Sequence, residues 1–181
     1  MTNNEFIIRE IQPDDNEHLA NVIREVILEM GAPKTGTAYE DKATDQMFEN
    51  FQKSRSFYYV VEYKNKVIGG AGIAPLQNSE NDFCELQKMY FLPILRGKGF
   101  GSKLIKSCLK KAVLSGYKNC YLETMPYMKA ATTLYKKNGF INLKKPLKGI
   151  HVRVSAYENK KANITTITVE LIATNKLLYS D

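Results

Sequence analysis

The sequence predicts an α/β protein whose mixed, twisted central sheet has about six to seven strands and is flanked by helices. Three observations support this fold class. Segments with the two-residue alternation of strands are interleaved with segments of helical periodicity. The strand–helix–strand unit over 84–124 has the length of a parallel crossover, which the handedness rule makes right-handed. Hydrophobic residues (44%) and charged residues (25%) occur in the proportions of an ordinary globular protein.

The N-terminal third is expected to form one strand and two helices. FIIREI (6–11) has strand composition, and the Pro-Asp-Asp at 13–15 then prepares a helix start. Apolar residues follow at helical spacing until Gly31, which is a natural helix stop. After the loop GAPKTGT (31–37), a weaker helix is expected over 39–53.

The middle of the chain reads as three strands. FYYVVEY (57–63) and KVIGGAGIAP (66–75) flank Lys64-Asn65 and predict a hairpin. The glycines of the second strand weaken a strand interior, and such glycines often mark the close approach of another backbone or of a ligand. A turn then leads into CELQKMYF (84–91), the fourth strand.

The C-terminal half alternates helices and strands, so that the full order is β-α-α-β-β-β-α-β-α-β-β. The expected elements are a helix over 101–113 that Gly116 ends, a strand over 119–124, a short helix over 128–135 and strands over 149–157 and 164–172. No linker, repeat or low-complexity segment interrupts this pattern. We therefore expect one domain over 1–181.

Charge is unevenly distributed along the chain. Net charge is +7, and the stretch from Lys129 to Lys161 holds nine Lys or Arg against one Glu. A solvated basic face explains this stretch, and attraction of an anionic ligand such as a phosphorylated cofactor is the alternative. No RNP-like or zinc-finger pattern supports a nucleic-acid partner. No apolar run of membrane-spanning length occurs and the N-terminus lacks the order of a signal peptide, so we expect a cytosolic protein without a membrane partner.

Cysteine and histidine usage disfavours several chemistries. Cys84, Cys108 and Cys120 are odd in number and widely spaced, which argues against a disulfide framework and favours small core residues. His18 and His151 are the only histidines, and no CxxC or HxxxH pattern occurs. A dedicated metal site is therefore not expected, and Ser-His-Asp or Cys-His catalysis is disfavoured.

The glycine-rich stretch RGKGFG (96–101) lies between a strand and a helix. Main-chain N–H groups at a helix start lack intrahelical partners and carry the positive end of the helix dipole. Glycines let an anion approach the chain closely, so the loop predicts a phosphate or pyrophosphate site. The stretch matches neither GxxxxGK[ST] nor GxGxxG, and a tight strand-to-helix turn without a ligand remains the alternative.

Two motifs resemble one known family. R-x-x-G-x-G follows a strand ending in KMYF, and YLETMPYMKAATTLYKKNGF (121–140) gives a strand, a helix with A-x-x-L-Y and a Gly-Phe turn. Together they resemble the signatures of the GCN5-related N-acetyltransferases (GNAT) over residues 84–140, and the upstream elements fit as well. The resemblance implies a GNAT-like sheet, acetyl-CoA as co-substrate without a metal, and direct transfer of the acetyl group to a primary amine in a ternary complex.

The resemblance also implies the residues that hold the cofactor. The pyrophosphate would be cradled by the main-chain amides of Arg96, Gly97, Lys98, Gly99, Phe100, Gly101 and Ser102. Met89, Tyr90 and Phe91 would pair their backbone with the pantetheine arm, in a gap between the splayed fourth and fifth strands. An amide there would hydrogen-bond the thioester carbonyl. The Lys98 side chain would either assist the phosphates or remain a solvated loop lysine.

Three residues are candidates for the proton transfers. Tyr135, the tyrosine of A-x-x-L-Y, is the implied general acid; without the resemblance it reads as one more aromatic on the apolar side of a helix. Glu85 is the candidate base, directly or through water, and a surface glutamate near Lys88 is the alternative. Side chains 85, 87 and 89 are expected to share one face of the strand. Glu123 is the reserve candidate and could instead organise the substrate pocket.

The sequence departs from the family pattern in two places. Many relatives have an asparagine where this chain has Met128, so that residue's contact to the cofactor is not assumed. The C-terminal stretch 149–181 does not align with the usual ending of the family, and it leaves the acceptor undetermined among small amines, amino acids, antibiotics and protein lysines. The helices within 17–53, with GAPKTGT, are expected to cover the acceptor side. A non-catalytic acyl-CoA-binding module is the alternative function, and a homodimer is compatible with the sequence.

Overall fold

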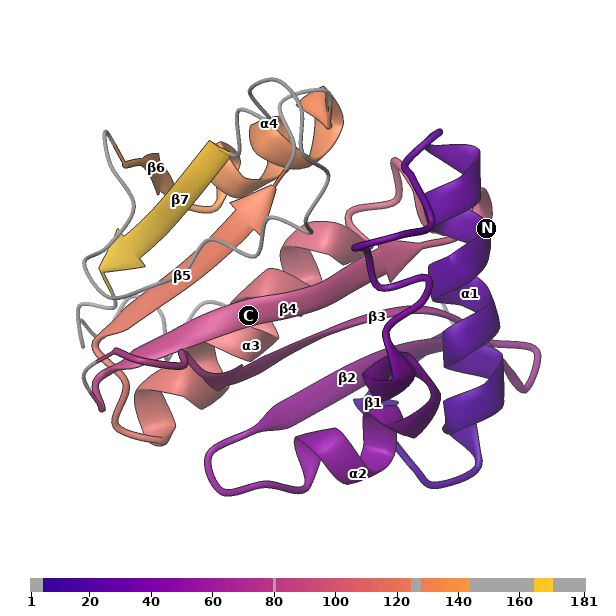
Figure 1. Ribbon diagram of the computed structural model, residues 1–181, viewed down its shortest axis with the longest axis horizontal. Helices are drawn as coiled ribbons and strands as arrows, with labels where there is room; N and C mark the ends of the chain where they lie inside the picture. The colour runs from indigo at the N-terminus through magenta and orange to yellow at the C-terminus, as the bar shows by residue number, and fades with distance from the viewer. Residues whose placement is uncertain (1–4, 80, 125–127, 144–164, 171–181) are drawn as a thin grey trace.

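Seven strands form one sheet in the computed structural model, which describes residues 5–79, 81–124, 128–143 and 165–170 (Figure 1). The strand order is β1-β2-β3-β4-β5-β7-β6, and among the neighbouring pairs of these described strands only β4 and β5 run parallel to each other. The strands are β1 (Phe6–Glu10), β2 (Phe57–Tyr63), β3 (Lys66–Pro75), β4 (Phe83–Phe91), β5 (Asn119–Thr124), β6 (Ile141–Asn142) and β7 (Thr165–Glu170). The predicted mixed α/β sheet is thus confirmed.

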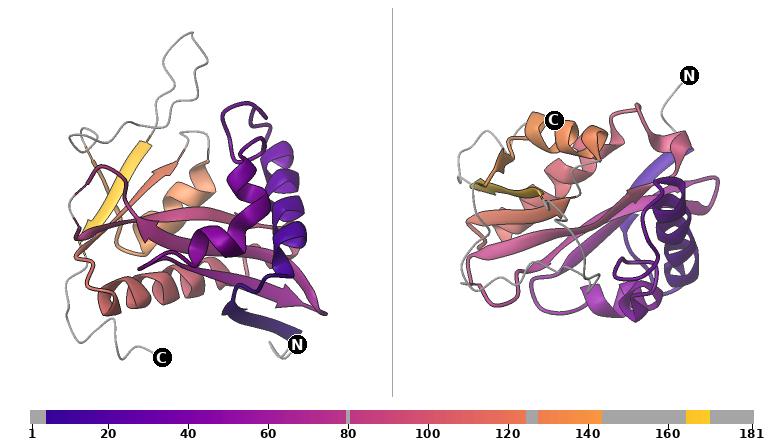
Figure 2. Two further views of the ribbon diagram at one scale, coloured as in Figure 1. Left: turned by 60° about the horizontal axis from the view of Figure 1, so that its bottom comes forward. Right: turned by 45° about the horizontal axis from the view of Figure 1, so that its top comes forward.

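Helices cover both faces of the sheet (Figure 2). They are α1 (Asp15–Glu29), α2 (Met47–Phe51), α3 (Phe100–Leu114) and α4 (Lys129–Lys137), with short 3₁₀ turns η2 (Lys42–Gln46) and η3 (Pro93–Leu95). The apolar stripe of α1 packs with α2 against one face, where Leu19, Ile23 and Phe51 are buried. The stripe of α3 packs on the opposite face, where Leu104 and Cys108 are buried. Among the described helices, none is both long and apolar enough to cross a bilayer.

Most of the predicted elements appear with the expected bounds. Strands 57–63, 66–75 and 119–124 are confirmed to the residue, and Lys64 and Asn65 both have positive φ, as a two-residue hairpin turn requires. The weak helix expected over 39–53 is instead a loop followed by η2 and α2, because Asp41 caps η2 through the Ala43 N–H.

At the C-terminal end, agreement is partial. The strand expected over 164–172 contains β7, whereas the one expected over 149–157 lies outside the described residues. The two-residue strand β6 was not predicted, since it is too short to show a periodicity. It pairs with β7 and completes the described edge of the sheet.

β4 and β5 separate after a short parallel pairing. Their partners are Phe83 with Asn119, Cys84 with Cys120 and Glu85 with Tyr121. Beyond Glu85, the described partners of β4 lie on β3, and those of β5 lie on β7. The two strands diverge from this point (Figure 1), which agrees with the predicted splaying of the fourth and fifth strands.

Candidate active site

Two cavities lie where β4 and β5 diverge, and Tyr90 lines both of them. The glycine-loop cavity has a volume of about 400 Å³ and is lined mainly by β4, the 96–102 segment and α4. The acidic cavity has a volume of about 550 Å³ and is lined by residues 36–41 and by the facing parts of β4 and β5. The two cavities therefore lie next to each other, with Tyr90 in both linings.

The glycine loop has the geometry of an anion site. Gly97 and Gly99 have φ of 73° and 81°, which residues with side chains rarely adopt. A Cβ added at either position would meet no atom within 4 Å, so the space above the loop is open. Gly99 is the N-cap residue of α3 and has no side chain to accept hydrogen bonds from the first turn, a position at which an external anion can accept them instead. These residues fit a diphosphate.

Most of the predicted cofactor-binding residues lie together. The glycine-loop cavity is lined by Met89, Tyr90, Phe91, Arg96, Gly97, Gly99, Gly101 and Ser102. Phe100 instead buries its side chain in the core, with its ring 5.2 Å from that of Phe6, so only its main chain is available to a ligand. Lys98 directs its ammonium toward the Phe6 ring, 5.9 Å from the centroid.

Arg96 already has strong partners within the protein. Its guanidinium donates to both carboxylate oxygens of Glu29 at 2.6 Å, and to the Phe91 carbonyl at 3.0 and 3.2 Å. The hydrogen bond with Arg96 lowers the pKa of Glu29 and raises that of Arg96. Arg96 thus ties the end of α1 to the end of β4 beside the glycine-loop cavity.

Tyr135 lines the glycine-loop cavity from α4 and is only 7% exposed. Its ring packs against Phe140 with centroids 5.8 Å apart. Burial, with a smaller contribution from Tyr90, raises the pKa of Tyr135 above its ordinary value. The hydroxyl is therefore held in the protonated form that a general acid needs.

Carboxylates dominate the lining of the acidic cavity. Glu85 and Glu123 come from the two diverging strands, and Glu40 and Asp41 come from the loop before η2. Among the described lining residues Lys88 is the single cation, so four carboxylates and one ammonium give a formal charge of −3. Both candidate bases therefore lie in one cavity. Glu85 accepts a hydrogen bond from Gln87 at 2.5 Å, and Glu123 accepts one from the Tyr121 hydroxyl at 2.8 Å.

The expectation that side chains 85, 87 and 89 share one face is wrong. Glu85 and Gln87 line the acidic cavity, whereas Met89 lines the glycine-loop cavity and packs on the core under α3. A β-bulge is the cause, because β4 has one extra residue relative to β3 at this point. One extra residue turns every later side chain to the opposite face.

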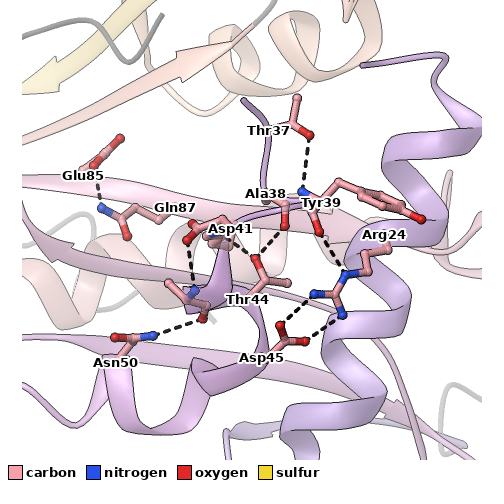
Figure 3. Close-up of polar contacts among 12 residues, drawn as sticks. Arg24, Thr37, Ala38, Tyr39, Asp41, Thr44, Asp45, Asn50, Glu85 and Gln87 are labelled. Atoms are coloured by element: carbon pink, nitrogen blue, oxygen red, sulfur yellow. Dashed lines mark hydrogen bonds and ion pairs between the residues drawn. The ribbon is translucent and has the colours of Figure 1, made fainter. Parts of the chain in front are cut away.

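Residues 37–45, which lead into η2 and include most of it, are fixed by polar contacts (Figure 3). Arg24 of α1 donates to the Tyr39 carbonyl at 3.0 Å and to both carboxylate oxygens of Asp45 at 2.7 and 2.8 Å. Thr44 donates to the Ala38 carbonyl at 2.7 Å. These contacts hold residues 37–45 beside β4, where Thr37, Ala38, Glu40 and Asp41 line the acidic cavity.

Several residues that line the two cavities were not predicted from the sequence. Ala131 and Leu134 lie in the A-x-x-L-Y motif and could have been found there. Glu40, Asp41 and Lys88 have no local signature, because only the folded loop and the bulge bring them to the cavity. Met128, at which the sequence departs from the expected family pattern, also lines the glycine-loop cavity.

The cysteines belong to the core, as expected. Cys84, Cys108 and Cys120 are free thiols with no exposed surface. Burial, with a smaller contribution from Cys84, raises the pKa of the Cys108 thiol. Within the described ranges, no group of three or more His, Cys, Asp or Glu side chains could hold a metal ion.

Known proteins resemble the chain in sequence and in fold. The model of the acetyltransferase (GNAT) family matches residues 24–140. The uncharacterized N-acetyltransferase YjgM of Escherichia coli (strain K12) is 44% identical over 135 residues, which cover 74% of this chain and 81% of that protein.

Two solved structures share the fold. The structure of yncA from Salmonella typhimurium, which holds acetyl-CoA, matches with a TM-score of 0.74 at 18% identity and covers 95% of this chain and 97% of that one. The spermidine N-acetyltransferase of Vibrio cholerae, solved with CoA and spermine, matches with a TM-score of 0.64 at 18% identity and covers 93% of this chain and 97% of that one.

Proposed function

Because the chain belongs to the acetyltransferase (GNAT) family of acetyl-CoA-dependent enzymes, we propose that it transfers the acetyl group directly to a primary amine in a ternary complex. The observation that carries this proposal is the adjacency of the two cavities, whose linings share Tyr90. A cofactor in one cavity and an acceptor in the other would meet there without a covalent enzyme intermediate. The buried cysteines support the direct route, since none of them is exposed to either ligand.

The glycine loop and the start of α3 would hold the diphosphate of acetyl-CoA. Acetyl-CoA supplies the acetyl group as an activated thioester. The open positions above Gly97 and Gly99 fit an anion, and the diverging ends of β4 and β5 leave room for an extended arm beside Met89, Tyr90 and Phe91. Tyr135, kept protonated by its burial, would hold a proton for the departing thiolate.

The acidic cavity would receive the acceptor. An amine with a pKa of about 10 arrives as a cation and must lose a proton before it can attack. Glu85 or Glu123 would bind the ammonium form and accept this proton, directly or through water. The charge of the lining favours acceptors with a further positive charge, such as diamines, over amino acids with a free carboxylate. The polyamine in the structure of the Vibrio cholerae relative is consistent with this preference.

The deciding experiment measures thiol release from acetyl-CoA in the presence of an amine panel. The panel holds a diamine, a monoamine of the same length and a carboxylate-bearing analogue. Thiol release that depends on the amine supports the enzyme, and a higher kcat/KM for the diamine supports the acceptor assignment. Saturable calorimetric binding of acetyl-CoA without turnover of any amine would favour the alternative, a non-catalytic acyl-CoA-binding module.

Tyr135→Phe tests the general acid. The variant keeps the ring in its packed position and removes the proton donor, so kcat should fall by roughly 100-fold or more while calorimetric affinity for acetyl-CoA stays within about twofold. Tyr117→Phe is the matched control, because Tyr117 is equally buried but lines neither cavity. An unchanged kcat in Tyr135→Phe would remove Tyr135 from the mechanism.

Three broader proposals concern the cellular compartment, the domain organisation and the oligomeric state. We place the reaction in the cytosol because the three cysteines are free thiols. One domain over 1–181 is proposed because cores on both faces of one sheet enclose the site. A homodimer is compatible with these features, and light scattering of the purified protein measures it.

A further inference from the structure

The bulge in β4 lies beside both cavities and gives one residue an unusual backbone. Gly72 of β3 pairs with Gln87, whereas Gly70 pairs with Tyr90, so the bulge falls between these two pairs. Lys88, inside the bulge, has a φ of 51°, in the left-handed region that residues other than glycine rarely adopt. Such a conformation persists only where the surroundings hold it in place.

The Tyr58 side chain holds the Lys88 backbone in this conformation. Its hydroxyl donates a hydrogen bond of 2.6 Å to the Lys88 carbonyl oxygen. Tyr58 belongs to β2, so its ring must cross β3 to reach β4. A Cβ added at Gly70 would lie 2.5 Å from the Tyr58 ring, and one added at Gly72 would also overlap it. The group whose close approach these glycines permit is therefore the Tyr58 side chain.

The Lys88 side chain reaches the acidic cavity, which is the proposed site of the acceptor. Its ammonium lies 2.7 Å from Asp41 Oδ2 and 3.1 Å from Thr44 Oγ1. Both partners belong to the segment that Arg24 holds beside β4, and Asp41 lines the acidic cavity. Lys88 is thus held at two points: its carbonyl accepts a hydrogen bond from the buried Tyr58, and its ammonium contacts Asp41 and Thr44 of the 37–45 segment.

We propose that Tyr58 is a positioning residue for acyl transfer, which holds the Lys88 carbonyl and so sets the direction of the Met89 N–H toward the bound thioester. The reason is covalent geometry. The Lys88 carbonyl and the Met89 N–H belong to one planar, trans peptide unit, in which the two groups point in opposite directions. Fixing the carbonyl on one side fixes the N–H on the other, and Met89 lines the glycine-loop cavity. The inference rests on the proposed function.

Tyr58→Phe against Tyr117→Phe tests the inference. Each variant removes one hydroxyl that donates to a main-chain carbonyl, that of Lys88 at 2.6 Å or that of Arg55 at 3.0 Å, and each keeps its ring. Both tyrosines are buried, but Tyr117 lines neither cavity. Three readouts are compared at a temperature at which circular dichroism shows both variants folded: kcat, the ratio of the Kd values for CoA and acetyl-CoA, and hydrogen exchange of residues 88–91 in the free protein.

Tyr58→Phe should lower kcat roughly tenfold, less than the 100- to 1,000-fold that follows removal of an oxyanion donor itself. It should also weaken acetyl-CoA relative to CoA, which lacks the thioester carbonyl, and speed exchange at residues 88–91. Tyr117→Phe should match the wild type in all three.

Equal kcat in the two variants would overturn the positioning role of Tyr58. The proposed function would still stand in that case, provided that the wild-type protein turns over. A lower kcat with unchanged exchange at residues 88–91 would also overturn it, since the effect would not pass through the bulge. Wild-type protein that neither binds acetyl-CoA nor releases thiol would instead contradict the proposed function itself.

Discussion

Burial sets the protonation state of Tyr135, the residue proposed as general acid. Tyr135 sits between α4 and the glycine-loop cavity, where the low polarity of its surroundings disfavours the phenolate. Its pKa is therefore raised above the ordinary value of about 10. Because a raised pKa extends the protonated form to higher pH, Tyr135 can donate over the whole range in which an amine acceptor gains its nucleophilic form.

The pH dependence of turnover follows from the upward shift of the Tyr135 pKa. With saturating acetyl-CoA, kcat/KM for the amine should rise with pH between about 6.5 and 9.5, because the acceptor loses its proton toward a pKa of about 10. No decline should follow from Tyr135 within this range, since its pKa lies higher. Initial rates with an enzyme-free blank for thioester hydrolysis measure the profile. A decline above pH 8 that Tyr135→Phe abolishes would contradict the raised pKa.

At the scale of elements, the strand-to-helix connection before α3 shapes the site proposed for the diphosphate. The left-handed backbone at Gly97 and Gly99 turns the chain sharply, so that α3 begins beside the ends of β4 and α4. Gly101 lies so close to α4 that an added Cβ would come 2.7 Å from Leu134 Cδ2. The glycines therefore combine a tight turn, close helix packing and an open space above the first turn.

Gly99→Ala and Gly116→Ala separate cofactor binding from backbone strain. The two glycines lie at opposite ends of α3, have φ of 81° and 80°, and have no atom within 4 Å of an added Cβ. Each substitution should therefore destabilise the fold by about 1–2 kcal/mol.

Only Gly99→Ala should weaken acetyl-CoA binding, by roughly tenfold or more, because it alters main-chain donors that would face the diphosphate. Calorimetric titration of acetyl-CoA measures the affinities, and urea unfolding measures the stabilities. Equal loss of affinity in both variants would show that the loop has no direct role in binding.

At the scale of the whole molecule, charge is sorted into regions. The chain carries +7, whereas the described lining of the acidic cavity carries −3. The net positive charge favours an anionic cofactor, and the local negative charge of the acidic cavity favours a cationic acceptor. A second charged cluster joins the first strand to the rest of the fold: Arg9 of β1 donates to Asp15 of α1 at 2.6 and 2.8 Å and to Glu62 of β2 at 2.8 Å.

Asp15→Asn should reduce the free energy of unfolding and make it less dependent on acid. Burial opposes ionisation of Asp15, but hydrogen bonds from Arg9 and the Gln12 N–H outweigh it and lower its pKa. A lowered pKa means that Asp15 stabilises the fold above about pH 4, its unfolded pKa, and that this stability is lost as pH falls through the folded pKa. The cost at pH 7 should be about 1.5–3 kcal/mol, and it should shrink toward pH 2.

Asp45→Asn is the control for this prediction. Asp45 makes the same two-pronged contact, with Arg24, but its side chain is 53% exposed against 7% for Asp15. Solvent screening should therefore keep its cost below about 1 kcal/mol. Urea unfolding between pH 2 and pH 7 measures both variants, and an equal cost for both would show that burial of the Arg9 pair contributes nothing.

Local sequence determined most elements and the glycine loop of this protein. Strand alternation in 57–63, helical spacing in α1 and α3, and glycines at the start of α3 depend on neighbours along the chain, so they can be read without the fold. The candidate roles of Tyr135 and Glu85 came from resemblance to a family, and their placement in adjoining cavities supports them.

Only the tertiary structure decided how the site is assembled. The bulge at Lys88 turned Met89 away from Glu85, and residues distant in sequence met there: Tyr58 from β2 at the Lys88 carbonyl, and Asp41 at its ammonium. The carboxylates of Glu40 and Asp41 reached the cavity in the same way. Such contacts leave no periodicity in the sequence, because they depend on which strands pair and where the register shifts.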